Sequence, residues 1–299
     1  GGGSARPRHK TFGPKELTAL LTILSEARLV HSDLFTSSAS VIATRVRELR
    51  AVDILRAARA LSLCAVRSET FFQATGDEVH RRCAEKVKDS GLRCEDLVEL
   101  CWNFCAAECY HHEMFQTTFG MLADTPKVTA DALCQLYEVH LALEAEQKDR
   151  YAEYRIDSDA VSSLLEHYKD NRKEGRCVSE RVRSDVVSSL KSLVDGTVNS
   201  NHRTSLGLLS DVAALRKKSS TDGYIHLEID SALTLVRALD QDESATVVDG
   251  GAALRRRIMQ KNGLRLVAVR ESEWRGLDDT KEKRRHLKSL LAALGDVLE

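Results

Sequence analysis

The stretch Phe72-Gln73-Ala74-Thr75 recurs 43 residues later as Phe115-Gln116-Thr117-Thr118, and Phe35 lies 37 residues before Phe72. Each of the three phenylalanines is followed seven residues later by an aliphatic residue, namely Ile42, Val79 and Leu122. A period of roughly 37 to 43 residues is typical of helical hairpins that stack side by side and bury one another's apolar faces. The repeat predicts a mainly α fold, an α-solenoid with the three phenylalanines in equivalent buried positions. The alternative is a chance likeness between amphipathic helices.

Composition agrees with a helical chain. Only three prolines occur in 299 residues, and aromatic residues make up 5%. The apolar spacing predicts a helix from Pro14, a break at Ser32-Asp33, and further helices at about 37–49, 51–64, 69–87, 94–109, 112–123, 128–147, 157–172 and 178–194. The unit that begins near Val128 is expected to be a degenerate fourth repeat. No apolar run approaches 18 residues, so no membrane span is expected.

The charge and the cysteines limit the classes of function. The formal net charge is −1, which is unlike a protein that coats nucleic acid by itself. Eight cysteines are spread through predicted helices, which favours a reduced compartment over a disulfide framework. Residues 1–12 are expected to form a flexible basic tail. This tail is compatible with the remnant of an organellar presequence and equally with an end defined by cloning.

The pattern changes after Gly196. Ile225, Leu227 and Ile229 alternate with polar residues, which predicts a strand with one buried face. An amphipathic helix at about 253–259, an apolar strand at 264–269 and a last helix at about 280–294 follow. The chain is therefore predicted to have a helical-repeat domain at 13–195 and a small α/β domain at 196–299.

The order of motifs in this C-terminal segment resembles the RAP domain over about 70 residues, roughly a quarter of the chain. The family pattern is a strand with Glu-x-Asp, a helix near Leu-x-Arg-Arg, a Gly followed by an apolar strand, then Glu-Trp and a closing helix. The matching stretches are Leu227-Glu228-Ile229-Asp230, Leu254-Arg255-Arg256-Arg257-Ile258-Met259, Asn262-Gly263-Leu264-Arg265-Leu266-Val267-Ala268-Val269, Glu273-Trp274, and His286-Leu287-Lys288-Ser289-Leu290-Leu291.

The resemblance implies a reduced restriction-endonuclease-like fold and an association with RNA in mitochondria or plastids. It also implies a position after octotricopeptide or heptatricopeptide repeats, which agrees with the 37-residue offset. The chain departs from the family at Ser231, where Gly is usual, and at Arg270-Glu271-Ser272, which replaces the usual Pro before Glu-Trp. These departures predict that no active site is retained.

Glu228 and Asp230 share one face of the predicted strand and offer oxygen ligands of the kind that Mg²⁺ takes in nucleases. A nuclease also needs a lysine, and no Glu-x-Lys or Asp-x-Lys triplet lies on the following strand. The alternative is that the two carboxylates pair with Arg255 or Arg257. We therefore predict a vestigial acidic site, no catalytic residue, no metal and no cofactor.

Cys101, Cys105 and Cys109 lie on one helix face at intervals of four residues. One straight helix cannot surround a tetrahedral metal ion, and free cysteines are commonly buried. We expect these three thiols in a seam between helices. Trp274 is expected to be a core residue between the second strand and the last helix.

Two groups of basic residues are the predicted RNA contacts: Arg255, Arg256, Arg257, Lys281, Lys283, Arg284, Arg285 and Lys288. Arginine binds phosphate in a bidentate manner, and both predicted helices must pack on the strand at 264–269, which would bring the two groups onto one surface. The alternative is a solvated helix face, on which acidic neighbours such as Glu282 supply the partners.

Together these features predict an RNA-associated structural component of an organellar ribonucleoprotein. The leading case is a mitochondrial ribosome subunit in the matrix that contacts ribosomal RNA and other ribosomal proteins, without a small-molecule substrate or a membrane. Two alternatives remain: a free organellar RNA-processing or RNA-stabilising factor, which includes a possible nuclease, and a protein–protein scaffold.

Overall fold

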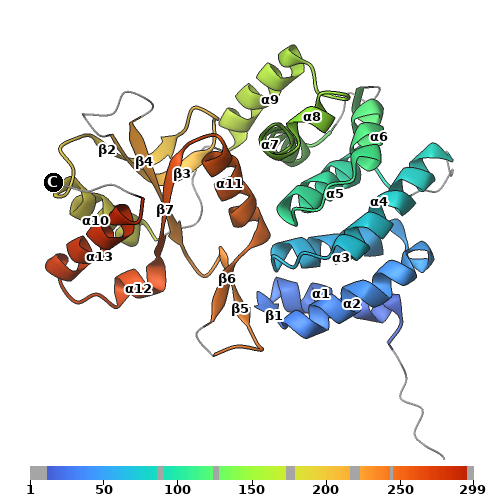
Figure 1. Cartoon of the computed structure of the whole chain (residues 1–299), viewed down its shortest axis with the longest axis horizontal. Helices are drawn as coiled ribbons and strands as arrows, with labels where there is room; N and C mark the ends of the chain where they lie inside the picture. The colour runs from blue at the N-terminus through green and yellow to red at the C-terminus, as the bar shows by residue number, and fades with distance from the viewer. Residues whose placement is uncertain are drawn as a thin grey trace, which may run out of the picture.

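The computed structural model describes residues 12–85, 91–123, 128–172, 179–215, 223–242 and 245–294. Within these residues the chain is mainly helical with a small C-terminal sheet region, which confirms the predicted mainly α class (Figure 1). Residues 1–11 of the predicted tail lie outside the described part. None of the described helices is long and apolar enough to span a membrane.

Successive helical hairpins form two rows that lie side by side (Figure 1). The first row consists of α1 (Pro14–Glu26), α3 (Ala51–Leu63), α5 (Cys94–Ala106) and α7 (Ala130–Glu146). The second row consists of α2 (Ser32–Thr44), α4 (Glu69–Ala84) and α6 (His112–Ala123), with a 3-10 turn, η1 (Val46–Glu48), after α2. Each helix contacts the next helix of its own row, so every hairpin buries a face against its neighbour.

The turn between the two helices has the same backbone geometry in three hairpins. Arg28, Ala65 and Glu108 all have positive φ, at 55°, 53° and 57°, and each lies just after the first helix of its hairpin. A residue in this left-handed region ends a helix and lets the next amide reach back to a free carbonyl, as Val66 does to Leu61 at 2.8 Å. The three positions are 37 and 43 residues apart, the same offsets that relate the phenylalanines.

The phenylalanine at the start of each second helix is buried, as predicted. Phe35, Phe72 and Phe115 are exposed by 0%, 1% and 0%. The predicted start of α2 was wrong, because the helix begins at Ser32 rather than near residue 37. Ser32 and Asp33 belong to its first turn, where an acidic side chain is stabilised by the helix dipole.

The fourth unit has no full second helix among the described residues. After α7 comes α8 (Lys148–Tyr151), a single turn, and then α9 (Ser158–Asn171), which packs against α7 of the first row. The predicted degenerate repeat is therefore one long helix, one turn and a helix that caps the stack.

A four-stranded sheet follows, with the order β2-β3-β4-β7. The strands β2 (Val198–Arg203), β3 (Leu209–Leu215) and β4 (Tyr224–Asp230) are antiparallel neighbours, whereas β4 and β7 (Arg265–Arg270) are parallel. The predicted strands at 225–229 and 264–269 correspond to β4 and β7. The structure adds β2 and β3, which were not predicted.

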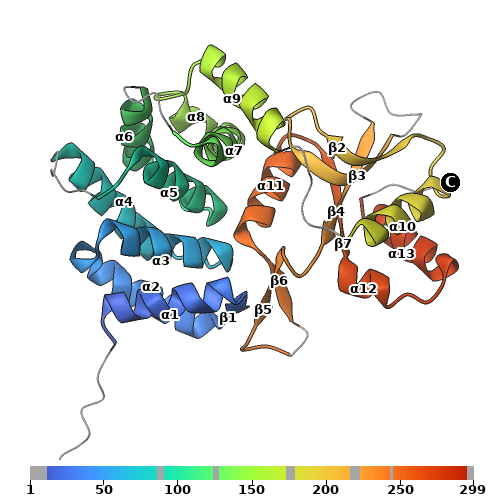
Figure 2. The same ribbon diagram turned by 180° about the vertical axis from the view of Figure 1, so that it is seen from behind.

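Helices cover both faces of this sheet. Ile225, Leu227 and Ile229 of β4 pack into a core with α10 (Glu180–Lys191) and α13 (Thr280–Ala292), and α12 (Glu271–Arg275) adds Trp274. The helix α11 (Gly250–Lys261) covers the other face (Figure 2), and its Arg256 contacts Glu228 and Asp230 of β4. Because α10 packs on the sheet, the change from helical rows to sheet core comes before α10 rather than at the predicted boundary of residue 195.

The helix α11 joins the sheet to the helical rows. It packs against α3, α5 and α7 while its other side faces β7 (Figures 1 and 2). A β-carbon at Gly250 would lie 1.9 Å from the carbonyl oxygen of Ser62, so the close approach of α11 to α3 requires glycine here. The short strand β1 (Leu29–Val30) pairs with β5 (Leu235–Ala238), which also pairs with β6 (Thr246–Val248).

Candidate nucleic-acid interface

The central arginine of the predicted RNA-binding triplet, Arg256, pairs with the two carboxylates of β4, Glu228 and Asp230, which we call the acidic strand face. Arg256 Nε donates to Glu228 Oε2 at 2.7 Å, and Arg256 Nη2 donates to Asp230 Oδ1 at 2.5 Å. Both carboxylates are buried, and the arginine side chain is 14% exposed. Burial alone would lower the pKa of Arg256, but Glu228 and Asp230 more than compensate and raise it. Glu228 and Asp230 therefore pair with Arg256, not with Arg255 or Arg257 as predicted.

The two flanking arginines point toward the helical rows. Arg257 Nε donates to Glu146 Oε1 of α7 at 3.0 Å, and its Nη2 donates to the carbonyl oxygen of Cys105 at 2.6 Å. Arg255 lies 3.9 Å from Glu138 of α7. Burial by itself would lower the pKa of both arginines. Neighbouring carboxylates raise it instead, chiefly Glu138 for Arg255 and Glu146 for Arg257. Each guanidinium group of the triplet therefore already lies next to a carboxylate of this chain. The phosphate contacts that we predicted for these three arginines are not supported.

The predicted continuous basic surface is wrong. The arginine triplet is on α11, which covers one face of the sheet, and the second basic group is on α13, which packs into the core on the opposite face. The strand between the two helices separates the groups instead of joining them (Figure 1).

The acidic strand face includes a third carboxylate that was not predicted. Asp211 of β3 is buried next to β4, and its Oδ2 accepts a hydrogen bond from the amide of Ile229 at 2.7 Å. Nothing in the local sequence around Asp211 indicates this position, because only the antiparallel pairing of β3 with β4 creates it. Within the described residues, no group of three or more His, Cys, Asp or Glu side chains is arranged to hold a metal ion.

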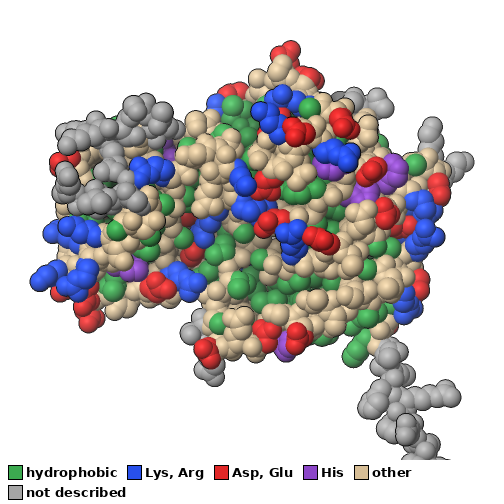
Figure 3. All heavy atoms as spheres, viewed as in Figure 1, with side chains coloured by type: hydrophobic (Ala, Val, Ile, Leu, Met, Phe, Trp, Pro, Cys, Tyr) green, Lys and Arg blue, Asp and Glu red, His purple; other side chains and the backbone are tan. Residues whose placement is uncertain are grey.

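The predicted basic residues of α13 are mostly exposed. Four of them recur at helical spacing and form what we call the α13 basic face: Lys281, Arg284, Arg285 and Lys288. None of the four makes an ion pair with another described residue. Basic side chains gather at this end of the molecule in the space-filling view (Figure 3). Lys283 differs, because its Nζ donates to Asp185 at 2.7 Å and lies 5.8 Å from the ring centroid of Trp274.

Trp274 is a core residue, as predicted. Its side chain is 1% exposed and packs with Val269 and Leu287, and its Nε1 donates to Asp185 Oδ2 at 3.0 Å. Asp185 therefore binds both Trp274 and Lys283, which fixes α10 against α12 and α13.

The predicted burial of the cysteine series is confirmed. Cys101 and Cys105 are fully buried and Cys109 is 6% exposed, in the seam between hairpins. Burial raises the pKa of Cys101 to about 12 and that of Cys109 to about 11. These thiols are therefore protonated and shielded in the folded chain.

We expect iodoacetamide to modify Cys94, which is only partly buried, while Cys101 and Cys105 remain unmodified until the chain unfolds. The protonated state and the burial of the two thiols both slow alkylation. Mass spectrometry of peptides, labelled with and without urea, measures the difference. Equal labelling of Cys101 in the two conditions would contradict its placement.

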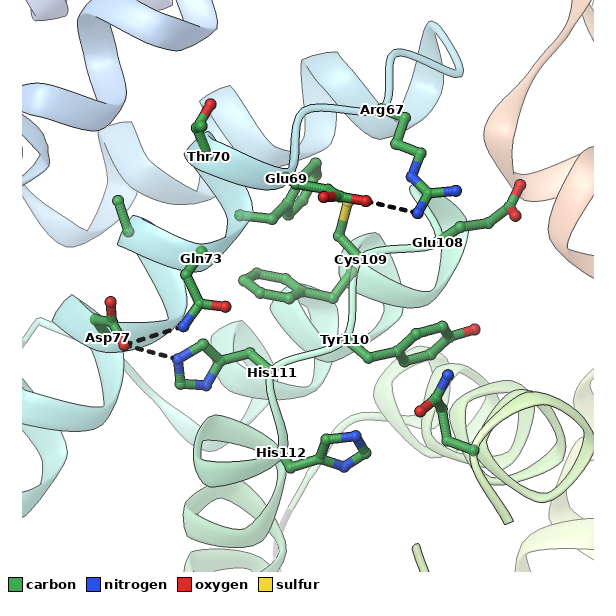
Figure 4. Close-up of a pocket in the computed structure, with 14 residues that line it drawn as sticks. Arg67, Glu69, Thr70, Gln73, Asp77, Glu108, Cys109, Tyr110, His111 and His112 are labelled. Carbon is green, nitrogen blue, oxygen red and sulfur yellow. Dashed lines mark hydrogen bonds and ion pairs between the residues drawn. The ribbon is translucent and has the colours of Figure 1, made fainter. Parts of the chain in front are cut away.

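A cleft of about 770 Å³ opens where the turn of the third hairpin meets α4 (Figure 4). Asp77 accepts a hydrogen bond from Gln73 at 3.3 Å and pairs with His111 at 2.9 Å, and Arg67 pairs with Glu69 at 2.7 Å. Burial lowers the pKa of His112, which keeps this ring neutral near pH 7. The acidic side chains of the lining outnumber its single arginine, so the cleft does not favour phosphate.

The segment that resembles the RAP domain contributes β4, α11, β7 and α13, in the expected order of strand, helix, strand and helix. The two basic groups of this segment lie in different environments. The arginine triplet is paired with carboxylates of the chain, whereas the α13 basic face is exposed to solvent. Comparison with known protein-family models gives no match, and no curated protein is significantly similar to the chain.

Proposed function

We propose that this protein is an RNA-associated structural component of an organellar ribonucleoprotein, with a mitochondrial ribosome as the leading case, and that it contacts RNA through the α13 basic face. The observation that carries the proposal is the row formed by Lys281, Arg284, Arg285 and Lys288, exposed and without acidic partners among the described residues. Basic side chains at this spacing reach phosphates along one backbone and release counterions when they bind.

We propose a structural role because electrostatic attraction contributes little to the affinity of this chain for RNA. Four phosphate contacts on a chain of net charge −1 support only weak binding to isolated RNA. Contacts with neighbouring proteins must then supply the rest of the binding energy. This combination suits a subunit of a large particle better than a free RNA-binding factor.

Two further observations favour this role over the alternatives of a nuclease and a free processing factor. Arg256 lies against Glu228 and Asp230, so a guanidinium group already neutralises the carboxylates that a nuclease would use for Mg²⁺. In addition, α11 covers a side of α3, α5 and α7, which reduces the helical surface open to a transcript. The chain is accordingly proposed to have no enzymatic activity.

The finer classification of the fold belongs to the same proposal. We infer an α-solenoid of the octotricopeptide or heptatricopeptide kind, supported by the recurring turn geometry at Arg28, Ala65 and Glu108. We further infer a RAP-like, restriction-endonuclease-like C-terminal unit, supported by the mixed sheet with helices on both faces.

Replacing all four residues of the α13 basic face with Gln is expected to weaken RNA binding about tenfold or more at low salt. The slope of log affinity against log salt should also become shallower, by about 0.9 on a duplex and about 0.7 on a single strand for each phosphate that the variant no longer binds. Fluorescence anisotropy of labelled duplex and single-stranded RNA, titrated with the full chain at several salt concentrations, measures both quantities. The side chains are exposed, so circular dichroism and thermal unfolding should remain unchanged.

The matched control removes four cations elsewhere, through the variants Lys15→Gln, Arg47→Gln, Arg56→Gln and Arg59→Gln combined. Both variants change the net charge equally, and an RNA contact specific to α13 predicts the larger loss of binding for the α13 variant. Equal weakening of RNA binding in the two variants would reduce the effect to net charge. Unchanged binding in the α13 variant would refute the RNA contact and favour the protein–protein scaffold.

A further inference from the structure

The second row of helices ends in an apolar groove. A cavity of about 860 Å³ lies between α6, α7 and α9 and is lined by Phe119, Leu122, Leu133, Leu136, Tyr154 and Ile156, among others. This volume is within the range of pockets that bind ligands, and the exposed lining is mainly apolar. The residues come from three helices and the connection before α9, so the groove is a feature of the packed stack.

Comparison with α4, the preceding helix of the second row, indicates what covers the equivalent face in the previous hairpin. In α4, the corresponding face is covered by the third hairpin. Asp77 pairs with His111, just before α6, at 2.9 Å, and His80 contacts Thr117 of α6 at 2.8 Å. A β-carbon at Gly76 would lie 2.3 Å from the His111 ring, which indicates how closely the two hairpins pack there.

In α6, the residues 43 positions after Gly76, Asp77 and Val79 are Phe119, Gly120 and Leu122. All three line the groove. Among the described residues no second-row helix follows α6, because α8 is a single turn and α9 packs on α7 in the first row. The groove therefore lies on the face that a next helix of the row would cover.

We propose that this groove binds an amphipathic α-helix of a partner protein, placed beside α6 as the row continues from α2 through α4 to α6. The helix would insert apolar side chains spaced at i, i+3 or i+4, and i+7 against Phe119, Leu122 and Leu136. Gly120 allows its backbone to approach, since a β-carbon built there meets no atom within 4 Å. This inference is independent of the RNA contact, because α13 lies on the far side of the sheet.

The rim of the groove is polar and limits how the helix lies. Arg155 at the rim is already paired with Glu144 at 2.8 Å, and Asp157 caps the N-terminus of α9 by accepting from Ala160 at 2.9 Å. These charges have partners within the chain, so the apolar floor rather than an ion pair provides most of the binding energy.

The test uses the full chain as bait for a phage-displayed library of helical peptides with randomised positions on one face. Selected peptides should carry apolar residues at i, i+3 or i+4, and i+7, and should gain helical circular dichroism on binding. Binding should be about tenfold or more weaker to the Gly120→Arg variant, in which a long charged side chain crosses the groove. The control variant Glu113→Gln makes the same change in net charge at an exposed position about two turns before Gly120, outside the residues that line the groove, and should bind as the wild type does.

Three results would overturn the proposal. One is selection of peptides that bind the Gly120→Arg variant equally well or that lack the helical spacing. Another is a dimer in sedimentation experiments that the Gly120→Arg variant abolishes, since a second copy of the chain would then be the occupant. The third is a small apolar molecule that copurifies with the wild type and is absent from the variant.

Discussion

Replacing Arg256 with Met is expected to lower the free energy of unfolding by about 3–5 kcal/mol. The substitution keeps the volume and the apolar stem but removes the guanidinium group between Glu228 and Asp230. These carboxylates are 1% and 2% exposed, so water cannot replace the missing partner. Removal of one member of a buried ion pair leaves the remaining charge in a low-dielectric environment, which is the source of the large effect.

Urea unfolding followed by circular dichroism measures this loss. Combining Arg256→Met with Glu228→Gln and Asp230→Asn should recover part of the stability, because neutral amides cost less to bury than carboxylates that have lost the Arg256 guanidinium group. The matched control is Arg275→Met, which breaks the exposed pair with Glu271 and should cost at most about 1 kcal/mol. If Arg256→Met unfolds at the same urea concentration as the wild type, the pair with Glu228 and Asp230 is not a structural element.

Replacing Phe115 with Ala is expected to lower the free energy of unfolding by about 3–5 kcal/mol. The Phe115 ring is fully buried and lies in edge or tilted contact with neighbouring rings, with centroids 6.3 Å from Phe104 and 6.4 Å from Phe119. Truncation removes apolar area and leaves a cavity inside the third hairpin, next to Phe104 and Phe119. The helices around it are fixed on several sides and cannot collapse fully into the space.

The control for Phe115 is the same substitution at Phe12, which is 66% exposed and should change stability by less than about 0.5 kcal/mol. Chemical denaturation of both variants is the measurement. Losses of similar size at Phe35 and Phe72 would extend the result to the equivalent positions of the first two hairpins. A loss at Phe115 no larger than the loss at Phe12 would contradict the packing of the third hairpin.

Local sequence patterns predicted most helices and two of the strands. The recurrence of Phe35, Phe72 and Phe115 located three hairpins, because helical spacing and helix-ending turns depend on residues close in the chain. Similarly, the alternation in β4 and the apolar run of β7 reflect burial directly. The start of α2 was misplaced because Ser32 and Asp33 are favourable both in turns and in the first turn of a helix.

The missed strands have weak local patterns. The edge strand β2, with the sequence Val-Asn-Ser-Asn-His-Arg, carries little apolar alternation. The buried strand β3 includes Ser210 and Asp211, polar residues that became acceptable only through pairing and hydrogen bonds within the sheet. The pairing of β1 with β5 joins residues more than 200 positions apart, for example Leu29 with Arg237, and no local signal predicts it.

By itself the sequence determined the helical hairpins, their period, the burial of the phenylalanines and cysteines, and the order of β4, α11, β7 and α13 in the C-terminal unit. Only the tertiary structure decided which basic residues remain open to a ligand. Consecutive residues of a helix differ by about 100° in direction, so the arginine triplet on α11 points to different neighbours. Arg256 meets a carboxylate 28 residues away and Arg257 meets one 111 residues away. Ion pairs depend on distance in space, and the docking of α11 between sheet and helical rows neutralised one predicted RNA-binding group while the α13 basic face stayed exposed.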